Sequence, residues 1–182
     1  MVTVTLQDVR ITRVSDGKYF TLNGTHTFEN VSGGLVINLP NELDSVVHHI
    51  RGNDFSVTFE NGSQHTWNFA RKRVLTFQNG LVATVTGLAE EGGKTDVVDW
   101  GMSRFGVSFI STIDEPVVLR QSCGFRVTAG VMTHSTQRFR ATVTFGLNQN
   151  GEPTDCPGAD PFYYRLEWLF ANIPLKSLLI PY

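Results

Sequence analysis

Apolar and polar residues alternate along most of this 182-residue chain, which is the period of a β-strand with one buried face. Phe55, Val57 and Phe59 take every second position, and polar residues stand between them. The pair Asn61-Gly62 then favours a tight turn, and the alternation resumes directly after it. This stretch therefore predicts a β-hairpin.

The same alternation continues to the end of the chain. It predicts one long strand over residues 117–132 and further strands over 139–145 and 162–170. Asn-Gly, Asp-Gly and Gly-Gly pairs recur between the apolar runs, where they favour turns. Apolar residues stand at helical spacing only over 42–50, and that segment is either a short helix or a loop.

These patterns predict an all-β protein with a single domain over residues 1–182, because a chain of this length can bury one core without help. Two architectures fit. One is an antiparallel β sandwich, and the other is an extended, twisted β meander built of hairpins, with at most one short helix. Variable loops are expected over 40–53, 88–103 and 146–161.

The charge of the chain gives no reason to expect a nucleic-acid partner. Lys and Arg number 15 against 17 Asp and Glu, so the formal net charge is -2, and no basic groove is visible. No apolar run is long enough to cross a bilayer, and the first residues read as a strand rather than as an export leader. An export signal, if the protein has one, is expected to have been removed.

Two cysteines allow only one intramolecular pairing, between Cys123 and Cys156. Cys156 stands in a polar, turn-forming stretch over 151–158, which would shelter a free thiol poorly. The sequence therefore favours a disulfide and an oxidising compartment, with two buried cytosolic thiols as the alternative.

From about Phe55 onward the order of features is more specific than that of β proteins in general. A strand pair contains the segment 65–73 (HTWNFARKR), and a variable acidic and Gly-rich stretch follows over 88–99. After another strand comes 116–130 (PVVLRQSCGFRVTAG), and a later strand leads to the second cysteine. This order resembles an uncharacterised family of secreted, lipoprotein-like β-rich proteins from Bacteroidetes.

The resemblance implies export, with the protein periplasmic, anchored to the outer membrane or extracellular. It implies a mostly antiparallel β architecture and, in many members, a lipid anchor that would not be part of this sequence. It implies no established activity. The chain departs from the family over 146–153, before the second cysteine, and in its apolar tail over 166–182.

Candidate metal ligands are sparse, and no metal site is predicted. His48 and His49 are neighbours, so their side chains point apart on either kind of regular element. A second set of oxygen ligands near Gly151 faintly resembles a calcium loop but lacks the terminal glutamate, so a plain hairpin loop is expected there. That set consists of Asn148, Asn150, Glu152 and Asp155.

No catalytic residue or cofactor is predicted either. The chain has no Gly-x-Ser-x-Gly motif, and a cysteine held in a disulfide cannot act as a nucleophile. Four acidic residues cluster in loop-like sequence, where two carboxylates would flank a glycosidic bond only if the fold brought them together. These residues are Asp96, Asp99, Asp114 and Glu115.

Aromatic residues make up 11% of the chain, and several stand in strands that should have one wet face. They suggest a stacking platform for sugars or a lipid groove, with core packing as the alternative. Trp100, Trp67 and Tyr163 are the candidate ligand-binding residues, and Trp168 and Tyr164 belong to the same set.

The sequence therefore predicts a non-catalytic cell-envelope or secreted protein that binds or scaffolds, with a polysaccharide, a lipid or an envelope protein as its partner. One alternative is a carbohydrate-active accessory module or hydrolase. The other is a self-assembling surface component, which an uncovered sheet edge would favour.

Overall fold

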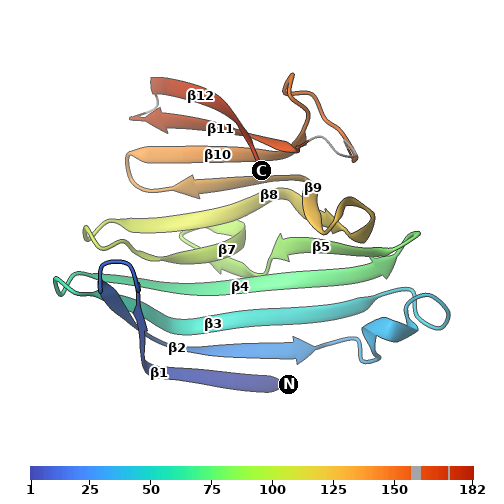
Figure 1. Ribbon diagram of the computed structural model, residues 1–182, viewed down its shortest axis with the longest axis horizontal. Helices are drawn as coiled ribbons and strands as arrows, with labels where there is room; N and C mark the ends of the chain where they lie inside the picture. The colour runs from blue at the N-terminus through green and yellow to red at the C-terminus, as the bar shows by residue number, and fades with distance from the viewer. Residues whose placement is uncertain (157–160, 172) are drawn as a thin grey trace.

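The computed structural model describes residues 1–156, 161–171 and 173–182. Over these residues the chain forms one 12-stranded sheet in which every pairing is antiparallel (Figure 1). The only helical segments described are two three-residue 3-10 turns, η1 (Val36–Asn38) and η2 (Gln121–Cys123). The all-β prediction is therefore confirmed.

The strands follow one another across the sheet in nearly the order of the chain. Their bounds are β1 Val2–Thr12, β2 Tyr19–Asn30, β3 Val46–Phe59, β4 Gln64–Phe77, β5 Leu81–Gly87, β6 Ala89–Glu91, β7 Lys94–Met102, β8 Ser108–Arg120, β9 Arg126–Ser135, β10 Phe139–Leu147, β11 Tyr163–Phe170 and β12 Ile173–Pro181. Of the two predicted architectures, the structure has the extended meander. No second sheet packs on it within the described ranges.

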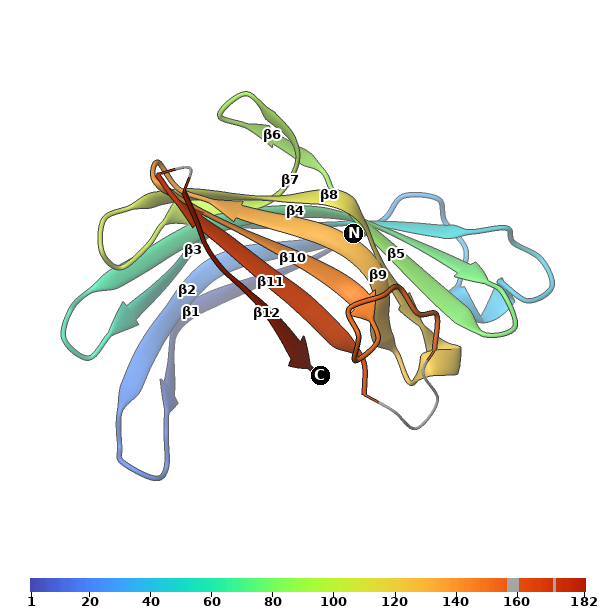
Figure 2. The ribbon, with the colours of Figure 1, turned by 90° about the horizontal axis from the view of Figure 1, so that it is seen from above.

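The sequential order is interrupted once, between β4 and β8. One part of β4 pairs with β7, as in Phe69 opposite Asp99, and the next part pairs with β5, as in Arg71 opposite Gly87. Strand β8 pairs with both β5 and β7 in turn, so these two strands share one position in the sheet. The β6–β7 hairpin rises from this position as an arm (Figure 2).

Bulges bend the sheet. Three register shifts coincide with an aspartate in the left-handed region, Asp8 in β1, Asp54 in β3 and Asp96 in β7, a conformation that Asp tolerates better than most residues. Each extra residue turns its strand and increases its twist. Figure 2 shows the result, a curved layer whose long hairpins and loops bend away from the β6–β7 arm.

The register decides which residues share the concave face. Directly paired residues project to the same side of a sheet, so a chain of pairings traces one row across ten strands. We call this the central row, and it consists of Val4, His26, Gly52, Phe69, Asp99, Ser111, His134, Ala141, Trp168 and Lys176.

The arm identifies the opposite face. Lys94 of the arm donates to the Ser135 hydroxyl at 2.5 Å, and Ser135 is paired beside His134, so it projects away from the central row. Since the arm stands on the convex side (Figure 2), the central row lies on the concave side.

The fully buried core is small and lies mainly on the concave face. One cluster forms where Leu39, from the loop after η1, covers Val46 and Leu75. The second surrounds Ile113 and Val117 of β8. Away from these clusters most apolar side chains of the concave face are half-buried, and no second sheet covers them among the residues that the structure describes.

Three local predictions were wrong. Residues 42–50 contain no helix, because the β-branched run after Ser45 begins β3, and Val47 is held by the Ser32 hydroxyl at 2.8 Å. Residues 117–132 are not one strand, because η2 and the left-handed Gly124 turn the chain between β8 and β9. The expected loops over 40–53 and 88–103 hold parts of β3 and β7, and residues 157–160 of the third expected loop lie outside the described residues.

The predicted disulfide is confirmed. Cys123 and Cys156 are bonded, with 5.7 Å between their Cα atoms, so the loop after β10 is tied to η2. A stable disulfide fits a protein outside the reducing cytosol. Among the described residues, no helix is long and apolar enough to cross a membrane.

Candidate functional site

The concave face of the sheet is the candidate functional surface. On most strands the concave face carries aliphatic and aromatic side chains, with polar residues such as His26, Asp99 and Ser111 between them, whereas the residues of the other face are mainly Thr, Ser, Asn and charged. Its apolar residues include Val4, Leu22, Phe28, Ile50, Phe55, Val57, Trp67, Phe69, Ile113, Val143, Leu166 and Trp168.

The chain as a whole exposes more surface than a compact protein of its size. The chain exposes 11008 Å² of surface. A compact monomer of 20.2 kDa would expose about 8,800 Å², which leaves an excess of about 2,200 Å². An excess of this size is comparable to the area that one partner contributes to a large, stable interface.

Unpaired polar atoms mark the same face. Three buried side-chain atoms in the described part of the chain lack a hydrogen-bond partner: His26 Nε2, Arg73 Nε and Asp99 Oδ1. By register all three residues project to the concave side. Buried polar groups are normally paired, because an unpaired one costs about 1 to 3 kcal/mol. The face therefore combines apolar surface with a few polar groups that have unused bonding capacity.

A serine, a histidine and an aspartate meet in the central row, but not in the order that nucleophilic catalysis uses. Ser111 Oγ lies 2.9 Å from His134 Nδ1 and is buried. Asp99 is paired with Ser111 from β7, whereas His134 is paired with Ser111 from β9. The aspartate and the imidazole therefore lie on opposite sides of the serine, and the aspartate cannot orient the imidazole as it does in a triad. The geometry therefore does not form a catalytic triad.

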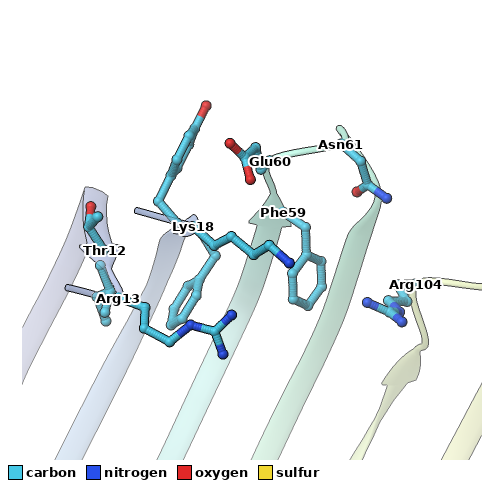
Figure 3. A pocket seen from close by; sticks show the side chains of 10 residues that line it. Thr12, Arg13, Lys18, Phe59, Glu60, Asn61 and Arg104 are labelled. Carbon is cyan, nitrogen blue, oxygen red and sulfur yellow. The ribbon is translucent and has the colours of Figure 1, made fainter. Parts of the chain in front are cut away.

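A cleft of about 850 Å³ opens at one end of the concave face, between the β1–β2 and β3–β4 turns. Phe20 and Phe59 line it, and Figure 3 shows Arg13 and Lys18 reaching toward Phe59 from one side and Arg104 approaching from the other. Arg13 and Lys18 both form ion pairs with the Asp16 carboxylate, whose negative charge offsets part of their positive charge at the cleft. The Arg104 guanidinium stands 5.3 Å from the centre of the Phe59 ring.

A second cavity of about 490 Å³, which we call the arginine cavity, lies at the opposite end of the same face. Strands β3, β4, β5 and β8 supply its floor, and η1 and the residue after Gly124 supply its walls. Arg71 and Arg73 are its charged residues, and the rest of its lining is apolar except for His48. Both cavities fall within the range of volumes that ligand sites occupy.

The concave face holds two imidazoles uncharged at neutral pH. Burial lowers the pKa of His48, and the adjacent Arg73 guanidinium lowers it further. Burial also lowers the pKa of His65, an effect that Asp99 opposes and His134 reinforces. Near neutral pH the positive charge in the arginine cavity therefore comes from its two arginines alone.

The three aromatic residues singled out in the sequence do not come together. Trp67 lies on the concave face beside Phe55, with 5.3 Å between ring centroids. Trp100 is paired with Asn68 and lies on the convex face, where it is half-buried. Tyr163 is paired with Leu147 next to the concave-facing Tyr164, so it too projects to the convex side. Trp168 and Tyr164 share the concave face with Trp67.

The four acidic residues are also separated. Asp99 lies in the central row, whereas Asp114 projects to the convex side and accepts hydrogen bonds of 2.6 Å from Thr112 and Thr133. These two carboxylates therefore cannot flank one glycosidic bond. Asp96 forms a bulge and Glu115 is exposed on β8.

The remaining candidate ligands bond within their own loops or face apart. His48 is buried on the concave face, and His49 is paired with Lys72 on the convex face. The Asn148 side-chain oxygen accepts from the amides of Asn150 and Glu152, which uses it to close the hairpin loop.

Sequence reasoning missed Arg71 and Arg73. The alternation could have identified them, because Trp67, Phe69, Arg71 and Arg73 stand at every second position of the segment 65–73. The two arginines therefore project to the same face as the two aromatic rings. Ser111 and His134 carried no such signal, since they meet only through the pairing of β8 with β9.

No family model, curated protein or solved structure matches this chain. The resemblance to secreted, lipoprotein-like proteins of Bacteroidetes stays a prediction.

Proposed function

We propose that this protein is a non-catalytic lipid-binding protein whose concave face receives an amphipathic lipid. The observation that carries the proposal is a largely apolar concave face on which, in the described part of the chain, no second sheet packs, together with cavities of ligand size at its two ends. Lipid is favoured over polysaccharide because seven aliphatic side chains and Phe125 line the cavity of about 490 Å³, which suits hydrocarbon better than a sugar ring.

The polar groups of the face support an amphipathic partner over a purely apolar one. His26, Arg73 and Asp99 each keep a buried atom without a partner. A ligand with hydrogen-bonding groups at one end would pair with Arg73 in the cavity, while its hydrocarbon contacted the apolar side chains of the same lining.

We propose further that the protein works in the cell envelope or outside the cell, either periplasmic, anchored to the outer membrane or extracellular. The Cys123–Cys156 bridge supports an oxidising compartment. An envelope location would also place the concave face where amphipathic lipids are abundant.

Binding of the uncharged dye Nile red, followed by its fluorescence and by its displacement with decanol, tests lipid binding. Ile50→Gln is expected to weaken Nile red binding about tenfold, because it places an amide in the apolar lining of the arginine cavity. The matched control His49→Gln changes the convex face of the same strand and should leave binding unchanged. Circular dichroism would verify that both variants keep the fold.

Absence of Nile red and decanol binding by the folded wild type would contradict lipid binding. Equal loss of binding in the two variants would remove the concave face as the site.

A second candidate function is self-assembly, which the free edge of β1 favours. Val2–Thr12 presents an unpaired edge without proline or lysine, and Val2 and Val4 are largely exposed. Two copies pairing through β1 would form one continuous sheet with two-fold symmetry. Light scattering should then give a dimer that Val4→Lys converts to a monomer, whereas a monomeric wild type would exclude this candidate.

A further inference from the structure

The arginine cavity has a charge pattern that identifies the kind of ligand it would hold. Its floor carries Arg71 and Arg73, and no acidic residue lines it. In the described part of the chain, no carboxylate lies within 4.0 Å of either guanidinium. Two cations without a counter-charge beside an apolar cavity complement an anion attached to an apolar chain.

Arg73 is held in place with bonding capacity to spare. Its Nη2 donates to His48 Nδ1 at 3.0 Å, and its guanidinium stands 5.7 Å from the centre of the Phe28 ring. A guanidinium can only donate, so His48 carries its own proton on Nε2 and does not neutralise the charge. The buried Nε of Arg73 has no acceptor. The side chain is thus positioned by two neighbours and lacks an anion.

Arg71 lies two residues away on the same face of β4 and is exposed. Its guanidinium stands 5.4 Å from the centre of the Phe69 ring. Both arginines thus line the cavity from the same face of β4, two residues apart, where a carboxylate between them would have a guanidinium donor on either side.

The remaining lining offers a channel for hydrocarbon. Leu75, Ala83, Val85 and Leu119 cover the floor beyond the arginines. Phe125 forms a wall in a left-handed conformation (φ 58°), which is costly for a bulky residue. The hydrogen bond from its amide to the Arg120 carbonyl at 2.9 Å and the neighbouring disulfide fix this wall.

We propose that the arginine cavity binds a single-chain fatty acid, with the carboxylate on Arg71 and Arg73 and the alkyl chain between the β-strand floor and Phe125. This inference rests on the proposed lipid-binding function and adds the class of ligand, the position of its head group and the residues that select it.

Calorimetry with decanoate, decanol and decyl phosphate tests the assignment, because the three share one chain and differ only in the head. Decanoate should bind most tightly to the wild type. Arg73→Gln and Arg71→Gln should each weaken decanoate binding about tenfold to a hundredfold and leave decanol binding unchanged. Lys72→Gln removes a neighbouring cation from the convex face and should have no effect.

Each other outcome is decisive. If decanol binds as tightly as decanoate and both arginine variants bind normally, the fatty-acid assignment is wrong while lipid binding stands. If decyl phosphate binds more tightly than decanoate, the assignment of a carboxylate head group is wrong. If Lys72→Gln weakens decanoate binding as much as the arginine variants do, the effect comes from the general positive charge of the protein and not from the cavity. If none of the three ligands binds, the proposed function fails together with this assignment. Arg71→Gln keeps the test interpretable if Arg73→Gln does not fold, because Arg71 is exposed.

Discussion

Removal of the Cys123–Cys156 bridge is expected to lower the free energy of unfolding by about 3 to 4 kcal/mol, as the loss of loop-closure entropy predicts for a bridge of this span. The two cysteines are separated by 33 positions, so the bridge restricts a long stretch of the unfolded chain. A loss of this size is a large part of the stability of a typical domain. The double variant Cys123→Ser/Cys156→Ser avoids a free thiol, and urea unfolding measures the difference.

Reductant supplies the control for this prediction. It should destabilise the wild type by the same amount and leave the double variant unchanged. An unaltered urea midpoint in the reduced wild type would contradict the prediction. Because η2 and Phe125 follow directly from β8 and are tied by the bridge, the reduced protein should also bind decanoate more weakly than the oxidised protein.

Gly146→Ala is expected to lower the free energy of unfolding by about 3 to 5 kcal/mol, through steric overlap and a disfavoured backbone conformation together. Gly146 has φ +75°, and a Cβ atom there would lie 1.9 Å from the Thr128 carbonyl oxygen. Because that oxygen belongs to the backbone of β9, β9 and β10 would have to separate. The same region holds the Tyr182 hydroxyl, which donates to the Val127 carbonyl and accepts from the Gly146 amide.

Gly17→Ala separates the two causes. Gly17 has a nearly equal φ of +73° but nothing within 4 Å of the added atom, so this variant carries only the conformational cost of about 1 kcal/mol. Thermal and urea unfolding should therefore rank the wild type first, Gly17→Ala second and Gly146→Ala last. Equal stabilities of the two variants would show that the contact with Thr128 does not matter.

A single curved layer explains why the proposed binding surface and the core of this protein lie on the same face. A sandwich buries its apolar faces against each other, but here full burial on the concave face is confined to the small clusters around Val46 and Ile113 and to a few further side chains such as Phe55. The rest stays available, and its cations and unpaired polar atoms lie where a ligand would contact them. The residues that stabilise the fold and those proposed to bind a ligand therefore share one face of the sheet.

Local sequence determined many of the strands and turns and the pairing of the two cysteines, but the segments 40–53 and 88–103, predicted as loops, hold parts of β3, β6 and β7. The period of two is a property of neighbouring residues, so Phe55, Val57 and Phe59 could be assigned to one face from the sequence alone. The same rule would have placed Arg71 and Arg73 beside Trp67. The same rule wrongly predicted a single strand over residues 117–132, because the turn at Gln121–Cys123 keeps the alternation of apolar and polar residues while it reverses the chain.

Only the tertiary structure decided which faces join and what they enclose. Pairing partners are distant in sequence, and each bulge, as at Asp54, shifts the parity of its strand by one residue. The central row from Val4 to Lys176 and the meeting of Arg73 with His48 depend on every one of those registers. The sequence by itself therefore determined that this protein builds sheets with one apolar side, whereas the register and the bulges decided that this side stays open, bends into a concave surface and carries two arginines at one end.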